Sequence, residues 1–210
     1  ILAARNVHKA FIHAAALLDL DVEWIYPVDI STLNNTNSLC SCRIEPEAVD
    51  KMLGAKSEKP LAVYLTAPDY LGYSPDIAAI AKICASHGVM LLVDNAHGAY
   101  LKFLPESSRH PIDLGAFMSC DSAHKTLPVL TGGAYLQLSE SVPQKIADGA
   151  KNALALFGST SPSYLILQSL DLCNRYISDG YREKLAEFLP IVNDTKEKIT
   201  SAGWDIFTSD

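Results

Sequence analysis

Residues 91–98, LLVDNAHG, place an acidic side chain where an apolar stretch ends. Asp94 follows a run of aliphatic residues typical of a buried strand, and an amide and a histidine come close behind it. A carboxylate in such a place loses hydration, which costs free energy unless a cation lies beside it. The pattern therefore predicts that Asp94 pairs with a cationic group.

A second cluster, DSAHKT, occupies residues 121–126 after another apolar stretch. Lysine that is partly removed from water is the residue type that forms Schiff bases with aldehydes. Ligands of open α/β sheets bind beyond the carboxyl ends of the strands, so Asp94, His97 and Lys125 should share one edge. Pyridoxal phosphate requires an amine for its aldehyde and a carboxylate for its pyridinium nitrogen. The protonated ring nitrogen would then be the cation beside Asp94, and the ring an electron sink.

Alternating strand and helix patterns surround both clusters and must position them. The expected strands are residues 22–28, 61–66, 89–94, 116–122, 132–139 and 204–207. The expected helices are residues 7–20, 46–54, 75–88, 143–156 and 163–201. Continuous apolar strands separated by helices predict an α/β fold with a mostly parallel sheet covered by helices on both faces.

Individual residues refine these boundaries. Asn6 is the expected cap of the first helix, and the polar segment 29–43 is an expected loop. Pro190 should interrupt the last helix, because proline lacks the backbone N–H that a helix interior needs. The strand at 204–207 would be the entry to a second domain. Because the chain begins at Ile1, we expect it to be a piece of a longer polypeptide.

Five stretches resemble, in order, the motifs of the Orn/Lys/Arg decarboxylases. They are RNVHKAFIHA, PDYLGY, LLVDNAHGAY, DSAHKTLPVLTGGAYL and STSPSYLILQSLD. The resemblance implies the aspartate-aminotransferase-like large domain of fold-type I pyridoxal-phosphate enzymes. On this basis residues 1–160 form the cofactor-binding large domain, with its N-terminal part missing. Residues 161–210 form a long helical connection and the start of a smaller C-terminal domain.

The resemblance implies that the chain belongs to a decarboxylase of arginine, lysine or ornithine that releases CO₂ and forms a polyamine-pathway amine. Lys125 would form the Schiff base and Asp94 would pair with the ring nitrogen. His8 would lie against the ring face, near the substrate carboxylate. The proton donor to the product carbon, and the choice among the three amino acids, stay open.

The resemblance also implies contacts with the rest of the cofactor. Ala96 would pack under the ring, and His97 would lie near the ring hydroxyl. Ser122 and His124 would hold the phosphate. Thr160 and Ser161 would reach the phosphate of the neighbouring subunit, because sites in this family are shared across a dimer. A homodimer or a higher homo-oligomer is therefore expected.

Several positions depart from the family pattern. Asn95 and Tyr100 stand where many members have Glu and His. These two differences affect the tuning of the site, and the cofactor-binding residues Lys125 and Asp94 are both present. The resemblance implies that a phosphate-binding loop precedes NVHK and that a C-terminal domain follows, and we expect both to lie outside these residues. We therefore expect these residues by themselves to bind the cofactor weakly or not at all.

Composition argues against several classes of binding partner. A net charge of −7 over 210 residues argues against nucleic acid. No apolar run is long enough to span a membrane, and the five cysteines follow no metal or disulfide spacing, so a metal-free, cytoplasmic protein with free thiols is expected.

Ordinary structural roles compete with each functional one. Asp94 alone could cap a helix, Lys125 alone could be a surface lysine, and Thr160–Ser161 could cap a helix that begins at Pro162. His13, His87 and His110 are interpreted as surface or helix residues. Other fold-type I activities, namely an aminotransferase or a lyase, and a catalytically silent assembly subunit are the alternatives for function.

Overall fold

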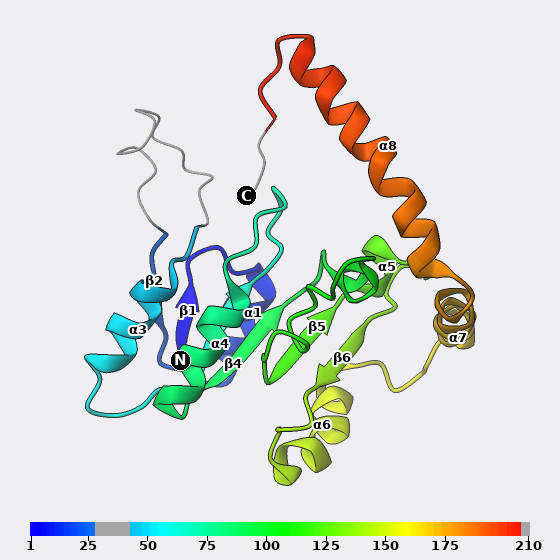
Figure 1. The fold of residues 1–210 in the computed structure, drawn as a ribbon. Helices are drawn as coiled ribbons and strands as arrows, with labels where there is room; N and C mark the ends of the chain where they lie inside the picture. The colour runs from blue at the N-terminus through cyan, green and yellow to red at the C-terminus, as the bar shows by residue number, and fades with distance from the viewer. Residues whose placement is uncertain (28–42, 207–210) are drawn as a thin grey trace.

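The computed structural model describes residues 1–27 and 43–206. A six-stranded sheet lies at its centre, with strand order β2-β1-β3-β4-β5-β6 (Figure 1). The strands are β1 (Leu2–Ala4), β2 (Glu23–Ile25), β3 (Ala62–Thr66), β4 (Met90–Asp94), β5 (Met118–Asp121) and β6 (Tyr135–Leu138). Strands β1 to β5 pair in parallel, and β6 pairs antiparallel to β5. The predicted mostly parallel α/β fold is confirmed.

Helices flank the sheet and extend beyond it. They are α1 (Lys9–Leu17), α3 (Pro46–Gly54), α4 (Ile77–His87), the 3₁₀ helix η1 (Ala99–Phe103), α5 (Ala123–Thr126), α6 (Gln144–Phe157), α7 (Tyr164–Ser178) and α8 (Tyr181–Ser201). Helices α3 and α4 cover one face of the sheet and α1 covers the other, while α8 extends away from it (Figure 1).

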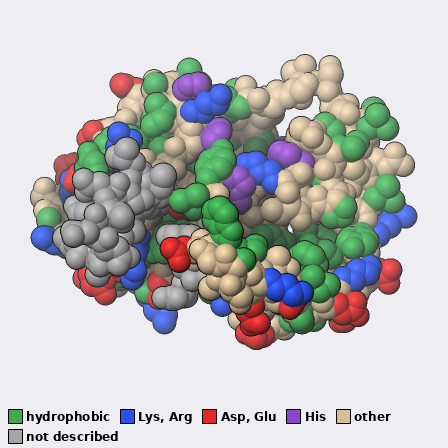
Figure 2. Space-filling model, turned by 90° about the horizontal axis from the view of Figure 1, so that it is seen from above, with side chains coloured by type: hydrophobic (Ala, Val, Ile, Leu, Met, Phe, Trp, Pro, Cys, Tyr) green, Lys and Arg blue, Asp and Glu red, His purple; other side chains and the backbone are tan. Residues whose placement is uncertain are grey.

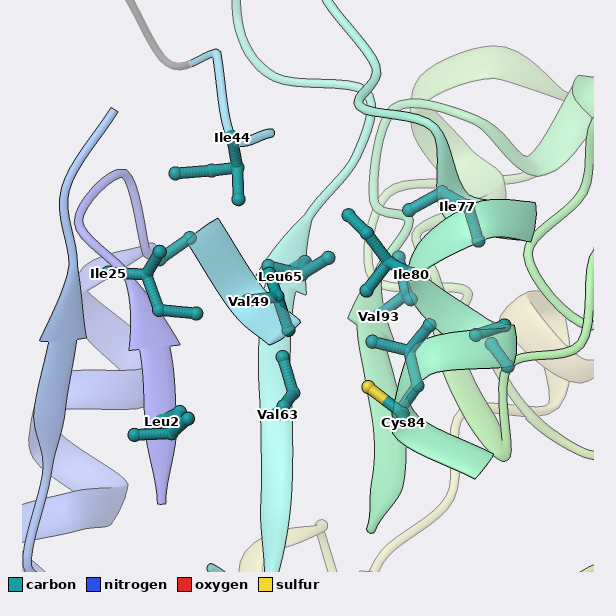
Figure 3. Close-up of a cluster of buried hydrophobic side chains, with 14 of the residues drawn as sticks. Leu2, Ile25, Ile44, Val49, Val63, Leu65, Ile77, Ile80, Cys84 and Val93 are labelled. Atoms are coloured by element: carbon teal, nitrogen blue, oxygen red, sulfur yellow. The ribbon is translucent and has the colours of Figure 1, made fainter. Parts of the chain in front are cut away.

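The main core lies between the sheet and helices α3 and α4 (Figure 3). Side chains alternate along a strand, so Val63 and Leu65 point into this core and Tyr64 points to the opposite face. There Tyr64 meets Phe11 of α1, with ring centroids 4.4 Å apart. Full burial of one such aliphatic side chain contributes about 1.5–3 kcal/mol. This packing fixes the strand ends from which the site is built.

A smaller core seats the short helix α5, which carries Lys125. Ala123 is fully buried, and Leu127 follows the helix into the same cluster. Cys173 of α7 and Tyr181 of α8 complete this cluster. Helices distant in sequence therefore hold the backbone of the lysine segment.

The helix and strand boundaries differ from expectation at both ends of the chain. Strand β1 has no counterpart in the expected elements, although its three residues are buried and it lies inside the sheet, between β2 and β3. The cap of α1 is His8 and not Asn6. Residues 204–206 form no strand, since a strand requires a neighbour to pair with, and Phe207 lies outside the described residues. All of the expected loop at 29–43 except Arg43 also lies outside them.

The predicted interruption at Pro190 is wrong. Helix α8 runs through Pro190, and the break falls at Gly180, whose φ of 72° is readily adopted by glycine. Proline removes the hydrogen bond to the carbonyl of Ala186. Both residues are exposed, so water can satisfy that carbonyl and the helix continues.

Candidate active site

A cavity of about 170 Å³ opens where the parallel strands end. Figure 2 looks onto this side of the molecule, where histidine side chains and a side chain of the Lys/Arg colour lie around a hollow. We call it the strand-end cavity; its lining residues are Asn6, Val7, His8, Thr66, Tyr70, Asp94, Ala96, His97, Ser122 and Lys125. Six of the predicted site residues, from three separate segments, are therefore brought together.

Asp94 is the last residue of β4, and neutral donors surround its carboxylate. The backbone N–H of Ala96 donates to Oδ1 at 3.1 Å, and the Tyr64 hydroxyl lies 3.5 Å from Oδ2. Burial, and secondarily the charge of Asp94, raise the pKa of Tyr64, so this hydroxyl keeps its proton and donates. Within residues 1–27 and 43–206, no lysine, arginine or histidine forms an ion pair with Asp94.

Lys125 reaches the same cavity from α5. Its Nζ lies 3.1 Å from Nε2 of His97, with the ammonium as donor and the imidazole nitrogen as acceptor. No carboxylate of the described chain forms an ion pair with Lys125. The cavity thus contains one carboxylate and one ammonium group, each without an ion-pair partner in the part that the structure describes.

His97 lies between the lysine and an aromatic ring. The ring of Tyr70 meets it edge-on, with centroids 4.7 Å apart. Because Nε2 accepts from Lys125, the proton of a neutral imidazole resides on Nδ1, which is buried and has no partner within the described chain.

Two more lining residues contain buried oxygens without a hydrogen-bond partner among the described residues, Asn6 Oδ1 and Thr66 Oγ1. Unpaired buried polar atoms are uncommon, because each costs about 1–3 kcal/mol. Together with Asp94 and Lys125 they fit a polar ligand that has a basic ring nitrogen and an aldehyde. This donor set therefore suits pyridoxal phosphate.

His8 combines a structural and a cavity-lining position. Its Nδ1 accepts a hydrogen bond from the backbone N–H of Ala10 at 3.2 Å and caps α1. The ring also lines the strand-end cavity. The cap fixes the orientation of the imidazole at the start of the helix.

Three predicted residues do not line the cavity. Nδ1 of His124 bonds the carbonyl oxygen of Gly133 at 3.0 Å. Thr160 and Ser161 lie exposed between α6 and α7. The cap of α7 is Ser163, so Pro162 precedes the helix and is not its first residue.

Several site residues were missed from sequence. Asn6, Thr66 and Tyr70 line the cavity, and Tyr64 lies beneath Asp94. The alternation in residues 61–66 could have placed Tyr64 on the face opposite the core, whereas the approach of Thr66 and Tyr70 depends on how the segments pack. The interpretation of His110 as a surface or helix residue is wrong, since it is 4% exposed and bonded to Asp121.

Membrane spans and metal clusters would indicate other functions. Among the described residues, no helix is long and apolar enough to cross a bilayer. In the same residues, no three or more His, Cys, Asp or Glu side chains group in a way that could hold a metal ion. Cys84, Cys120 and Cys173 are free thiols, and Cys40 and Cys42 lie outside the described residues.

Comparison with known proteins assigns the chain to a family. The family described as "Orn/Lys/Arg decarboxylase, major domain" matches residues 1–209. The uncharacterized protein YaaO of Bacillus subtilis (strain 168) is 32% identical over 202 residues, which are 96% of this chain and 41% of that protein. An arginine decarboxylase of the same strain is 28% identical over 201 residues, 95% of this chain and 39% of that enzyme. The chain therefore spans about two fifths of the length of these curated relatives.

A structure described as SPT with PLP superimposes with a TM-score of 0.72 at 13% identity, covering 99% of this chain and 48% of that one. This likeness shows the fold, and fold-type I enzymes are its neighbours, as expected. Family and donor set together support pyridoxal phosphate as the cofactor. With its motifs, its sheet and its match to the major-domain model over residues 1–209, the chain belongs to the Orn/Lys/Arg decarboxylase family.

Proposed function

We propose that this chain is the cofactor-binding part of a pyridoxal-phosphate-dependent decarboxylase of a basic amino acid: arginine, lysine or ornithine. One observation carries the proposal. Asp94 and Lys125 line one cavity, and neither has an ion-pair partner among the described residues. Two opposite charges left unpaired at one strand edge favour a ligand that needs both.

The chain's residues have separate tasks. When bound, pyridoxal phosphate supplies an electron sink for the electron pair left by a departing carboxylate. Lys125 would hold the cofactor aldehyde, and Asp94 would keep a proton on the ring nitrogen. Tyr64 and the N–H of Ala96 orient the Asp94 carboxylate, with His8 as a cover for the ring.

Contacts with the phosphate would come from Ser122 and His124, and those with the ring hydroxyl from His97. Ser122 lines the cavity, and Nε2 of His124 is left available when Nδ1 bonds Gly133. Ala96 also lines the cavity, in accordance with a position under the ring. The arginine decarboxylase relatives support a basic amino acid as the substrate.

We also propose a homo-oligomer in which Thr160 and Ser161 serve the neighbouring subunit. The helix ends beside them present apolar side chains to the surface: Leu156 is 79% exposed and Tyr164 is 82% exposed. Leu154 and Phe157, in the last turn of α6, are also exposed, and apolar side chains grouped in this way commonly mark an interface. A cytoplasmic location accords with the free thiols.

Trapping of the lysine tests the proposal. The intact protein, as its gene encodes it, is incubated with pyridoxal phosphate, reduced with borohydride and mapped by peptide mass spectrometry. We expect the label on Lys125 and none on Lys102, which is paired with Asp113 outside the cavity. Labelling of Lys102 or Lys145 in place of Lys125 would refute the assignment. CO₂ release with arginine, lysine and ornithine then identifies the substrate, and keto-acid formation without CO₂ would indicate an aminotransferase.

A further inference from the structure

Three buried polar side chains join the two loops that carry His97 and Lys125. Asn95 is 0% exposed, Asp121 3% and His110 4%. Nδ2 of Asn95 donates to Oδ1 of Asp121 at 2.7 Å, and Nε2 of His110 lies 2.9 Å from Oδ2. We call Asn95, His110 and Asp121 the buried network; none of them lines the strand-end cavity.

The network lies on the other side of the strand ends from the cavity. Asp94 and Cys120 are register partners on β4 and β5. Side chains alternate along a strand, so the next residues, Asn95 and Asp121, point the opposite way. The buried network can therefore influence the cavity only through the backbone that it holds.

Hydrogen bonds assign a role to each ring nitrogen of His110. The backbone N–H of Ile112 donates to Nδ1 at 3.3 Å, which leaves the Nε2–H to donate to Asp121. Ser119 Oγ adds a longer contact to Asp121 at 3.4 Å. A buried carboxylate is tolerated only when it is hydrogen-bonded, so the loss of one donor leaves an under-solvated charge.

Each end of the network leads to one side of the Lys125–His97 contact. Asn95 begins the turn 95–98, which Gly98 N–H closes on the Asn95 carbonyl at 2.9 Å and which carries His97. Asp121 precedes Ser122, the cap of α5, and α5 carries Lys125. The bond between Asn95 and Asp121 thus fixes the turn to the helix.

Stability alone does not explain this arrangement. Apolar side chains of similar volume would fill the space at equal or lower cost than a buried charge and its donors. We propose that Asp121, held by His110 and Asn95, is a positioning residue that sets the place of Lys125 relative to His97. The inference rests on the proposed function only for the identity of the aldehyde that Lys125 binds.

Two rates in the intact, cofactor-free protein test the inference. The first is competitive acetylation of Lys125 relative to the exposed Lys145 by acetic anhydride; the second is borohydride trapping of Lys125 with pyridoxal phosphate. In His110→Phe we expect the relative acetylation of Lys125 to rise about threefold or more, since its contact with His97 loosens. Trapping should fall roughly tenfold or more, because the amine is no longer oriented.

Matched variants separate positioning from general destabilisation. His110→Gln keeps a donor for Asp121 and should restore both rates to within about twofold. Val49→Ala, a cavity in the core beneath α3, should lower thermal stability without changing either rate. General unfolding would raise the acetylation of all lysines. It would also bring the ratio of Lys125 to Lys145 acetylation close to the ratio measured in the unfolded protein.

Two kinds of failure remain distinct. Wild-type values of both rates in folded His110→Phe would overturn the positioning role, whether or not pyridoxal phosphate is the cofactor. Absence of trapping in the unsubstituted protein would contradict the proposed function, while the acetylation ratio would still decide on the network. If His110→Phe does not fold, Asn95→Ala removes the other donor and is judged by the same two outcomes.

Discussion

Asp94 accepts hydrogen bonds from two neutral groups, a backbone N–H and the hydroxyl of Tyr64. Burial raises the pKa of Tyr64, so the phenol stays protonated throughout the physiological range and adds no charge of its own. The Asp94 carboxylate is thus held by neutral donors and also lines the cavity, where a cationic group can lie beside it.

The first prediction follows from that charge. Asp94→Asn should fold normally and still be trapped at Lys125, but lose roughly a hundredfold or more in kcat, because a neutral amide cannot keep the ring nitrogen protonated. Turnover and thermal unfolding of the intact protein are the measurements. Asp76→Asn is the matched control, since Asp76 caps α4 and asparagine caps equally well. Near-normal turnover in folded Asp94→Asn would rule out the electron-sink role.

At the scale of the elements, the turn 95–98 is packed closely around Gly98. A Cβ at Gly98 would lie 2.1 Å from Asn95 Oδ1 and 2.7 Å from side-chain atoms of both Pro68 and Leu101. No real side chain approaches so closely, so glycine is required here by space. The turn, the 67–73 loop and η1 meet at this point, and His97 is carried by the turn.

A pair of glycine substitutions tests this packing. Gly98→Ala should reduce the free energy of unfolding by about 1–3 kcal/mol, because the neighbours must shift. Gly149→Ala, with nothing within 4 Å of the added Cβ on α6, should raise it by about 0.5–1 kcal/mol. Denaturant unfolding of the intact protein measures both. Equal effects of the two substitutions would show that the close contacts at Gly98 relax without cost.

At the scale of the whole molecule, the loop with Thr160 and Ser161 lies apart from the cavity of its own chain. Neither residue lines that cavity, and both are exposed beside apolar helix ends. A two-fold interface presents the same patch twice, so each subunit could lend this pair and receive it. The division into residues 1–160 and 161–210 remains a prediction.

Complementation tests the shared site. Intact subunits with Lys125→Ala are mixed with subunits in which Thr160 and Ser161 are both replaced by alanine. A mixed dimer has one site with both defects and one with neither, so activity should return toward a fraction of the wild-type value as subunits exchange. Subunit exchange is verified with two affinity tags. Persistent inactivity after proven exchange would mean that the pair serves its own subunit or none.

Local sequence patterns by themselves predicted the parallel sheet, the edge that carries the site and the family. Apolar runs of strand length, separated by amphipathic helices, predict a parallel sheet, and the residues just beyond such strands share one edge. Asp94, His97 and Lys125 were assigned to one site on that basis, and the structure brings them to one cavity. The motif order identified the family, which the match over residues 1–209 confirms.

Only the tertiary structure decided the features that depend on packing between distant segments. Strand β1 is too short to show a period, and its place inside the sheet follows from its pairing with β2 and β3. Pro190 is tolerated because the carbonyl it leaves unpaired is exposed to water. His110 looks like any loop histidine in sequence, yet folding places it against Asp121. Burial and pairing depend on which groups meet in space, and no local pattern records that.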